Sequence, residues 1–159
     1  MPVITREIEI DATSDRVWAV LSDFGGVYKW NPTVTHSSLI EDQETGVGAQ
    51  RSCTVAGFGE ITERVTAWEE GRSATVEIEG APMMKRAAAT LRVEARGEAT
   101  LVSATVDYQP GWGPIGALMG ATIMKRKFGQ TFDLLLAGLR HYVLTGEEVG
   151  TEVPELRTA

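Results

Sequence analysis

One long apolar pattern from Pro114 to Thr145 limits the folds that this chain can adopt. Proline suits the first turn of a helix, and Gly146 suits a left-handed C-cap. A helix of this length is roughly 45 Å long at about 1.5 Å per residue, more than one small flat sheet usually covers. We therefore expect a curved sheet that wraps the helix on the face formed by residues spaced three and four apart: Ile115, Leu118, Met119, Thr122, Met124, Phe128, Phe132, Leu135, Leu136, Leu139, Tyr142 and Val143.

Short segments with a period of two fill most of the chain before this helix, and they indicate strands. Glycine- or proline-containing turns join most of them, so antiparallel hairpins are expected. Two short helices are predicted after the first strand, the first broken at Gly25-Gly26 and the second, Val27–Trp30, stopped by Asn31-Pro32. The predicted strands are Val3–Ile10, Val34–Glu41, Ala49–Val55, Gly59–Glu69, Ser73–Glu79, Ala87–Ala95 and Leu101–Tyr108.

These elements predict an α+β fold in which a seven-stranded, curved antiparallel sheet wraps around a long C-terminal helix. A twisted sheet touches such a helix well at one end and splays away at the other, so a cavity is expected between them. Residues 1–146 are predicted to form a single ligand-binding domain, followed by an acidic, disordered tail over 147–159. Small residues at predicted inward positions suit either close helix packing or an open pocket: Ala67, Ala74, Ala87, Ala89 and Ala104.

The charge of the chain argues against nucleic-acid binding. Its 159 residues carry a net charge of -7, and the only cationic cluster, Lys125-Arg126-Lys127, is interpreted as the solvated side of the long helix. A single cysteine, Cys53, excludes an intrachain disulfide and a cysteine-rich zinc site. The two histidines, His36 and His141, lie too far apart for a metal motif, and no metal or other cofactor is expected.

The sequence predicts a cytoplasmic protein. Its N-terminus lacks the charged and apolar segments of an export signal, and no apolar stretch is long enough to span a membrane. The sequence leaves open whether the protein is a monomer or a homodimer.

The order of elements and several local motifs resemble the helix-grip superfamily (SRPBCC), which includes the START lipid-transfer domains, the birch-pollen-allergen family and the polyketide cyclase/dehydrase family. The resemblance covers nearly the whole chain and implies a hydrophobic ligand held between sheet and helix. The motifs that carry it are Val17–Phe24 in the first helix, Trp30-Asn31-Pro32, Gly48–Arg51, Thr62–Val65 and Pro110.

Residues 48–85 look like bacterial polyketide-cyclase-like proteins and the plant hormone receptors related to them. In those receptors the loop after the third strand gates the pocket, which implies such a role for Ala56-Gly57-Phe58-Gly59. This loop lacks the proline of their gate, and Gly80–Met84 lacks the histidine-arginine pair of their latch.

Glu63 and His36 are the candidate catalytic residues. Glu63 shares a strand face with Ile61 and Val65, so it points into the pocket if that face looks inward, where a carboxylate needs a partner or a raised pKa. The resemblance also implies a polar ligand contact at this position. In the reversed register Glu63 is solvated and faces Arg51 or another strand partner. His36 could reach the pocket as a proton shuttle, although lone strand histidines more often lie at the surface or in a satisfied core position.

The candidate ligand-binding residues surround the predicted pocket. Arg51 could anchor a carboxylate or enol oxygen of the ligand, or pair with a glutamate across the sheet. Tyr108 and Trp112 could stack on an aromatic ligand or pack in the core. Methionines could adapt to varied apolar ligands or fill gaps in the core. The remaining candidates are Phe58, Met83 and Met84 at the rim and Met119 and Thr122 on the long helix.

Three functions are therefore considered. The first is binding of a hydrophobic or aromatic small molecule, lipid or polyketide-like, in the cavity. The second is an enzyme of the polyketide cyclase, aromatase or dehydratase kind, in which Glu63, His36, Arg51 or Tyr108 moves protons. The third is a protein-interaction module that uses the rim loops. An exposed apolar patch without an internal cavity would favour this third function.

Overall fold

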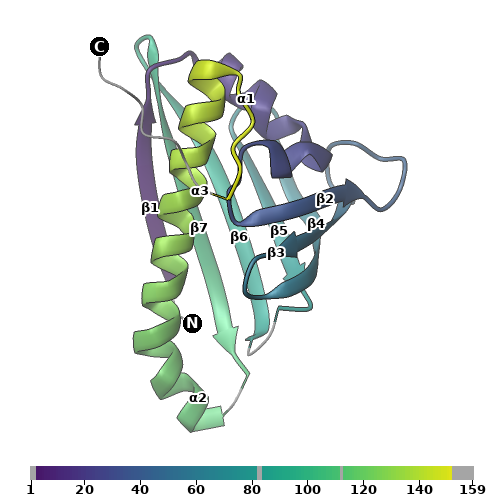
Figure 1. Cartoon of the computed structure of the whole chain (residues 1–159), viewed down its shortest axis with the longest axis vertical. Coiled ribbons are helices and arrows are strands. Elements are labelled where there is room, and N and C mark those ends of the chain that lie inside the picture. The colour runs from purple at the N-terminus through teal and green to yellow at the C-terminus, as the bar shows by residue number, and fades with distance from the viewer. Residues whose placement is uncertain (1–2, 82–83, 112, 152–159) are drawn as a thin grey trace.

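The computed structural model describes residues 3–81, 84–111 and 113–151. The predicted elements occur in the predicted order, and β6 and β7 extend beyond their predicted bounds (Figure 1). The elements are β1 (Val3–Ile10), α1 (Ser14–Ser22), the 3-10 helix η1 (Phe24–Lys29), β2 (Val34–Leu39), β3 (Gln50–Val55), β4 (Gly59–Glu69), β5 (Ser73–Glu79), β6 (Met84–Arg96), β7 (Ala99–Pro110), α2 (Gly113–Met119), the π-helix η2 (Gly120–Met124) and α3 (Lys125–Thr145).

The seven strands form one antiparallel sheet in the order β1-β7-β6-β5-β4-β3-β2. Consecutive strands from β2 to β7 are neighbours, and β1 joins the free edge of β7 in an unbroken register from Val3 opposite Asp107 to Ile10 opposite Thr100. The sheet curves around α3, which runs lengthwise along β1 and β7 (Figure 1). The α+β helix-grip architecture predicted from the sequence is confirmed.

A β-bulge in β4 changes which side chains face the helix. The pairing with β5 shifts between Val65 and Ala67, so one extra residue reverses the alternation beyond Val65. Ala67 is exposed and Trp68 turns toward the interior. The inward position expected for Ala67 is therefore wrong.

The long C-terminal helix is divided into three parts. The seven residues of α2 lead into the five π-helical residues of η2, and α3 then continues for 21 residues. It ends at the predicted left-handed C-cap, where Gly146 has a φ of 72° and its N–H donates to the Tyr142 carbonyl oxygen over 2.8 Å. Within the described residues, no helix is long and apolar enough to cross a bilayer.

The C-terminal half of α3 packs closely against η1. Gly138 lies so near the carbonyl group of Trp30 that a Cβ atom at this position would overlap the carbonyl oxygen. Beyond the helix, the Val149 N–H donates to the Lys29 carbonyl oxygen over 2.9 Å, and the Val149 side chain is buried. The first residues of the predicted tail are thus anchored to η1, while 152–159 lie outside the described part of the chain.

Candidate functional site

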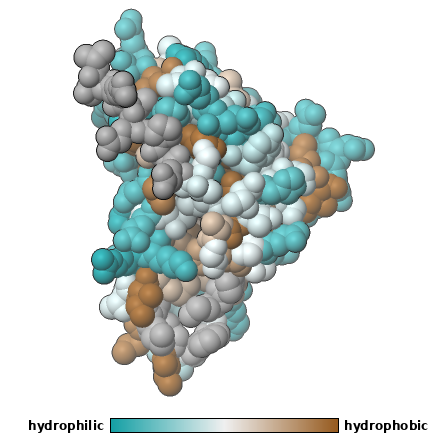
Figure 2. Space-filling model, viewed as in Figure 1, coloured by the Kyte–Doolittle hydropathy of each residue, from teal (hydrophilic) through white to brown (hydrophobic). Residues whose placement is uncertain are grey.

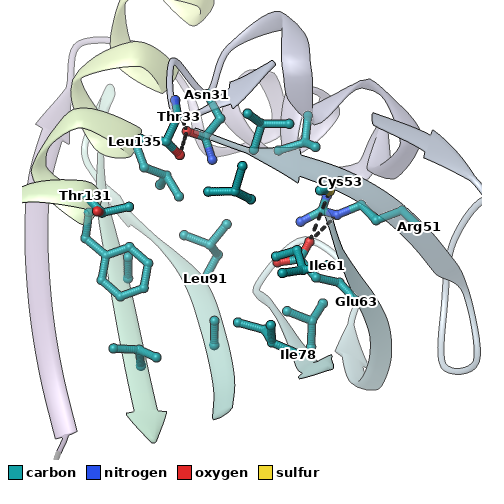
Figure 3. A pocket seen from close by; sticks show the side chains of 18 of the residues that line it. Asn31, Thr33, Arg51, Cys53, Ile61, Glu63, Ile78, Leu91, Thr131 and Leu135 are labelled. Atoms are coloured by element: carbon teal, nitrogen blue, oxygen red, sulfur yellow. Dashed lines mark hydrogen bonds and ion pairs between the residues drawn. The ribbon is translucent and has the colours of Figure 1, made fainter. Parts of the chain in front are cut away.

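A cavity of about 140 Å³ lies between the curved sheet and α3 (Figure 3). Side chains from α1, η1, all strands from β2 to β7 and α3 line it. Ala74, Ala89 and Ala104 belong to its sheet wall, so at these three positions the small residues leave an open pocket. Most of the lining is apolar and includes Leu21, Val55, Ile61, Ile78, Leu91 and Leu135.

The turn between β3 and β4 closes one side of the cavity. Gly57 and Gly59 have φ angles of 83° and 85°, which favour glycine, and they hold Phe58 between them. The Phe58 ring stacks on Phe128 of α3 with 6.4 Å between ring centroids, and Lys127 Nζ lies 4.3 Å from the Phe58 centroid. Phe58 and Phe128 both line the cavity, so the structure places Phe58 in its wall.

A buried ion pair provides the main charged feature of the cavity wall. Arg51 and Glu63 stand opposite each other on β3 and β4, and Arg51 Nε donates to Glu63 Oε2 over 2.5 Å (Figure 3). The two side chains are only 10% and 13% exposed. Glu63 therefore faces the cavity, which is the inward one of the two orientations that the sequence left open. Its partner there is Arg51, which the sequence had offered as a partner for the solvated orientation.

Two further contacts hold the guanidinium group of Arg51. Its Nη1 donates to the Phe24 carbonyl oxygen over 2.9 Å, and the group lies 4.0 Å from the centroid of the Phe24 ring. A guanidinium has five N–H donors and a carboxylate about four acceptor sites. The hydrogen bonds to Glu63 and to the Phe24 carbonyl oxygen use two of the five donors of Arg51. The Arg51–Glu63 pair could therefore also hydrogen-bond to an oxygen atom of a ligand.

Cys53 lies beside this ion pair but is not an activated thiol. Its Sγ is 3.7 Å from Glu63 Oε2, the distance of a weak hydrogen bond in which the thiol donates. Burial, and next the negative charge of Glu63, raise the pKa of the Cys53 thiol to about 12. The side chain is therefore a buried, neutral thiol at physiological pH.

A pair of tryptophans, Trp18 of α1 and Trp68 of β4, forms another part of the wall. Their rings meet edge to face with centroids 5.2 Å apart, and their indole N–H groups donate to the two carboxylate oxygens of Glu70 over 2.8 Å and 2.7 Å. The hydrogen bond from Trp68, followed by that from Trp18, lowers the pKa of Glu70. Sequence reasoning missed this tryptophan pair because the bulge in β4 hides the inward position of Trp68.

Asn31 is a second polar lining residue that sequence reasoning missed. It was interpreted only as part of a helix stop, but its Oδ1 accepts hydrogen bonds from the Thr33 N–H over 3.0 Å and the Thr33 hydroxyl over 2.7 Å. Both residues line the cavity near Leu135 (Figure 3). The motif Asn-Pro-Thr, in which an asparagine can bond to the chain two residues on, was the available signal.

His36 does not reach the cavity. The pairing of β2 with β3 shifts between Val34 and His36, so Val34 faces inward while His36 is exposed and Ser37 is buried. A regular strand would place His36 on the same face as Val34, but the β-bulge adds one residue between them and turns His36 to the surface, so its suggested role as a proton shuttle in the pocket is not possible in this structure. A catalytic pair of Glu63 and His36 is therefore not formed.

The other predicted ligand-binding residues have different positions. Met84 lines the cavity, whereas Thr122 is exposed on η2. Tyr108 is fully buried and packs against Phe128 with 4.9 Å between centroids, so it supports a lining residue, and burial raises its pKa. The remaining candidates fall outside the described residues or side chains: Met83, Trp112 and the side chain of Met119.

Comparisons with known proteins agree with this architecture. The model of the family described as "Polyketide cyclase / dehydrase and lipid transport" matches residues 1–143. No curated protein matches the sequence significantly.

Solved structures with low sequence identity share the fold. A START superfamily protein from Mycobacterium smegmatis is 17% identical with a TM-score of 0.72, and the match covers 89% of this chain and 97% of that one. A protein from Thermobifida fusca is 22% identical with a TM-score of 0.73, covering 90% and 93%. The di-domain ARO/CYC protein BexL of the BE-7585A biosynthetic pathway is 18% identical with a TM-score of 0.73, covering 91% of this chain and 47% of BexL.

Proposed function

Because the chain belongs to the polyketide cyclase/dehydrase and lipid transport family, we propose that it binds a small hydrophobic or aromatic molecule in the cavity between the sheet and α3. The observation that carries this proposal is an apolar cavity with a buried Arg51–Glu63 pair in its wall. Apolar pockets with a few placed polar groups are typical of small-molecule sites.

The size of the cavity favours a compact ligand. Its volume is about 140 Å³, and an apolar protein cavity of about 150 Å³ is known to bind benzene. One aromatic ring, or two with some movement of side chains, therefore fits better than a long acyl or polyketide chain. A hydroxyl group on the ring would donate to the Glu63 carboxylate, and a carbonyl group would accept from the Arg51 guanidinium.

Calorimetric titration with naphthol and naphthalene tests this proposal. The wild-type protein is expected to bind naphthol more tightly than naphthalene, because only the hydroxyl can reach the ion pair. Ala89→Leu, which fills the cavity with three carbon atoms, is expected to weaken naphthol binding by about tenfold or more. Ala67→Leu is the matched control, since Ala67 is an exposed strand alanine. Equal binding by both variants would contradict a site in the cavity.

An enzymatic function is the second candidate, favoured by the Glu63 carboxylate in a mostly apolar wall. In a cyclisation, Glu63 would take a proton from the carbon between two ketone groups, and Arg51 would hold the resulting enolate oxygen. The enolate carbon would then bond to a second carbonyl carbon of the same chain, whose oxygen takes up a proton. This function predicts ring formation from a short linear poly-ketone, measured by the absorbance of the product.

Glu63→Gln separates the two functions. It is expected to abolish cyclisation while naphthol still binds. Binding by the wild-type protein without turnover of the ketone would leave the binding function alone.

A further inference from the structure

Large aliphatic side chains are exposed at the end of the molecule formed by α2 and η2. Ile115, Leu118 and Ile123 are 75%, 79% and 60% exposed. Figure 2 shows apolar surface gathered at this lower end, with hydrophilic surface directly above it. Single exposed aliphatic residues are ordinary, but a group of them at one end of a protein marks an interaction surface.

The π-helical geometry of η2 helps to align these side chains. Leu118 follows Ile115 by three positions, the spacing of one helix face. Ile123 follows Leu118 by five positions across a segment in which hydrogen bonds join residues five apart. The three side chains therefore form one stripe, which we call the apolar tip.

Three cations follow the apolar tip directly. Lys125, Arg126 and Lys127 form the first turn of α3 and are all exposed. Their charge is opposite to that of the whole chain, which carries a net charge of -7. The general charge of the protein repels an anionic surface, so a contact with such a surface must be made through this local cluster.

We propose that the apolar tip and the adjacent Lys125-Arg126-Lys127 cluster dock on a lipid bilayer that contains anionic lipids. Aliphatic side chains enter the boundary between headgroups and acyl chains, and the cations interact with the negative phosphates. A second copy of this chain suits the surface less well, because a symmetric contact through the tip brings two cationic clusters together. The cluster, first interpreted as a solvated helix side, thus gains a partner of complementary charge.

This docking would place the cavity next to the lipid surface. Lys127 contacts Phe58 at the cavity rim, and Met84 at the start of β6 pairs with Pro110 at the end of β7, just before α2. Phe58 and Met84 both line the cavity. An apolar molecule could therefore pass between the bilayer and the cavity over a short path. The membrane contact itself does not depend on whether the cavity binds a ligand.

Vesicle co-sedimentation of the whole chain tests the proposal. The protein is expected to bind vesicles of phosphatidylcholine mixed with phosphatidylglycerol, with a partition coefficient on the order of a hundredfold above that for phosphatidylcholine alone, because each of the three cations contributes about 1 kcal/mol. High salt should remove the difference, because it screens the cations. Failure of the wild-type protein to sediment with the mixed vesicles would overturn the proposal.

Two double variants separate the apolar and cationic contributions. Ile115→Ser with Leu118→Ser is expected to abolish sedimentation with mixed vesicles. Lys125→Gln with Arg126→Gln is expected to weaken binding to mixed vesicles by about thirtyfold, because Lys127 alone then remains of the cluster. All four residues are exposed, so the fold should persist, which circular dichroism checks.

A matched control carries the same change elsewhere on the surface. Ile40 and Val47 are exposed aliphatic residues in the connection between β2 and β3. Ile40→Ser with Val47→Ser is expected to bind vesicles like the wild-type protein. An equal loss of vesicle binding in this control would show non-specific adhesion and overturn the proposal. So would a tip variant that binds vesicles like the wild-type protein but has a smaller molar mass in light scattering, because the tip would then serve self-association.

Discussion

Replacing Arg51 with methionine should expose the energetic cost of the ion pair in the cavity wall. The change removes the guanidinium group and leaves the Glu63 carboxylate without its charged partner, in a side chain that is only 13% exposed. It also removes the donor to the Phe24 carbonyl oxygen and the cation above the Phe24 ring. Methionine keeps much of the apolar length of the arginine side chain, so the main loss is electrostatic.

The magnitude follows from the burial of the pair. Removing one partner of a buried salt bridge costs about 3–5 kcal/mol of unfolding free energy. The Glu63 side chain keeps 13% of its surface exposed, so we expect the lower end of that range. For a chain of this length, about 3 kcal/mol lowers the melting temperature by roughly 6–12 °C.

Urea unfolding followed by circular dichroism measures this cost. The midpoint of Arg51→Met should fall while the slope of free energy against urea stays constant. Adding Glu63→Leu should recover much of the lost stability, because no unpaired charge then remains. Arg64→Met is the control, since the Arg64–Glu77 pair is more exposed and is expected to contribute less than about 1 kcal/mol.

Two results would refute this reasoning. One is a loss of less than about 1 kcal/mol for Arg51→Met, which would mean that water solvates Glu63 as well as arginine does. The other is a double variant with Glu63→Leu that is as unstable as the single one. The loss would then come from packing around Phe24 and not from an unpaired carboxylate.

Three further predictions concern other parts of the site. Gly138→Ala should lower the unfolding free energy by about 1–3 kcal/mol in urea unfolding, because the new methyl group overlaps the Trp30 carbonyl, whereas Gly150→Ala meets no atom and should be neutral. The lowered pKa of Glu70 means that its stabilising contribution is complete above its ordinary value of 4.5 and is lost as the pH falls through the lowered folded value, so Glu70→Gln should flatten this part of the stability profile and alter the fluorescence of the tryptophan pair. The Cys53 thiol should resist alkylation by iodoacetamide at mildly alkaline pH and react rapidly in urea; equally fast reaction of the folded protein would contradict its raised pKa.

The alternation of side chains along a strand could be predicted as far as the strand stays regular. Between Ile61 and Val65 the period of two is undisturbed, so the sequence indicated correctly that Glu63 shares a face with these two residues, but it left open whether that face looks inward. Beyond a bulge the same rule gives the wrong face, as it did for His36 and Ala67. Neither bulge has a glycine that would mark it in the sequence, and only one type of bulge requires a glycine.

The helix and its cap could also be predicted, because they depend on local chemistry. The apolar period and Gly146 gave the course and the end of α3. Local chemistry does not predict that η2 divides the C-terminal helix, or that Trp18 and Trp68 share the carboxylate of Glu70. The tryptophan pair and Glu70 belong to α1, β4 and the turn after it, and only the curvature of the sheet brings them together.

The space between the sheet and α3 persists because the helix is held at two separate places. At Gly138 the C-terminal half of α3 packs directly against the Trp30 carbonyl. Near the N-terminal end of α3, Phe128 stacks on Phe58 of the β3–β4 turn. Between these contacts the sheet wall is formed partly by alanines, whose small side chains leave room for the cavity. To close the cavity, α3 would have to break either the contact of Gly138 with Trp30 or that of Phe128 with Phe58. The free energy that these two contacts contribute to folding therefore offsets the cost of the empty apolar space. A ligand that fills this void gains contacts without having to displace the helix, which is why a compact apolar molecule suits the site.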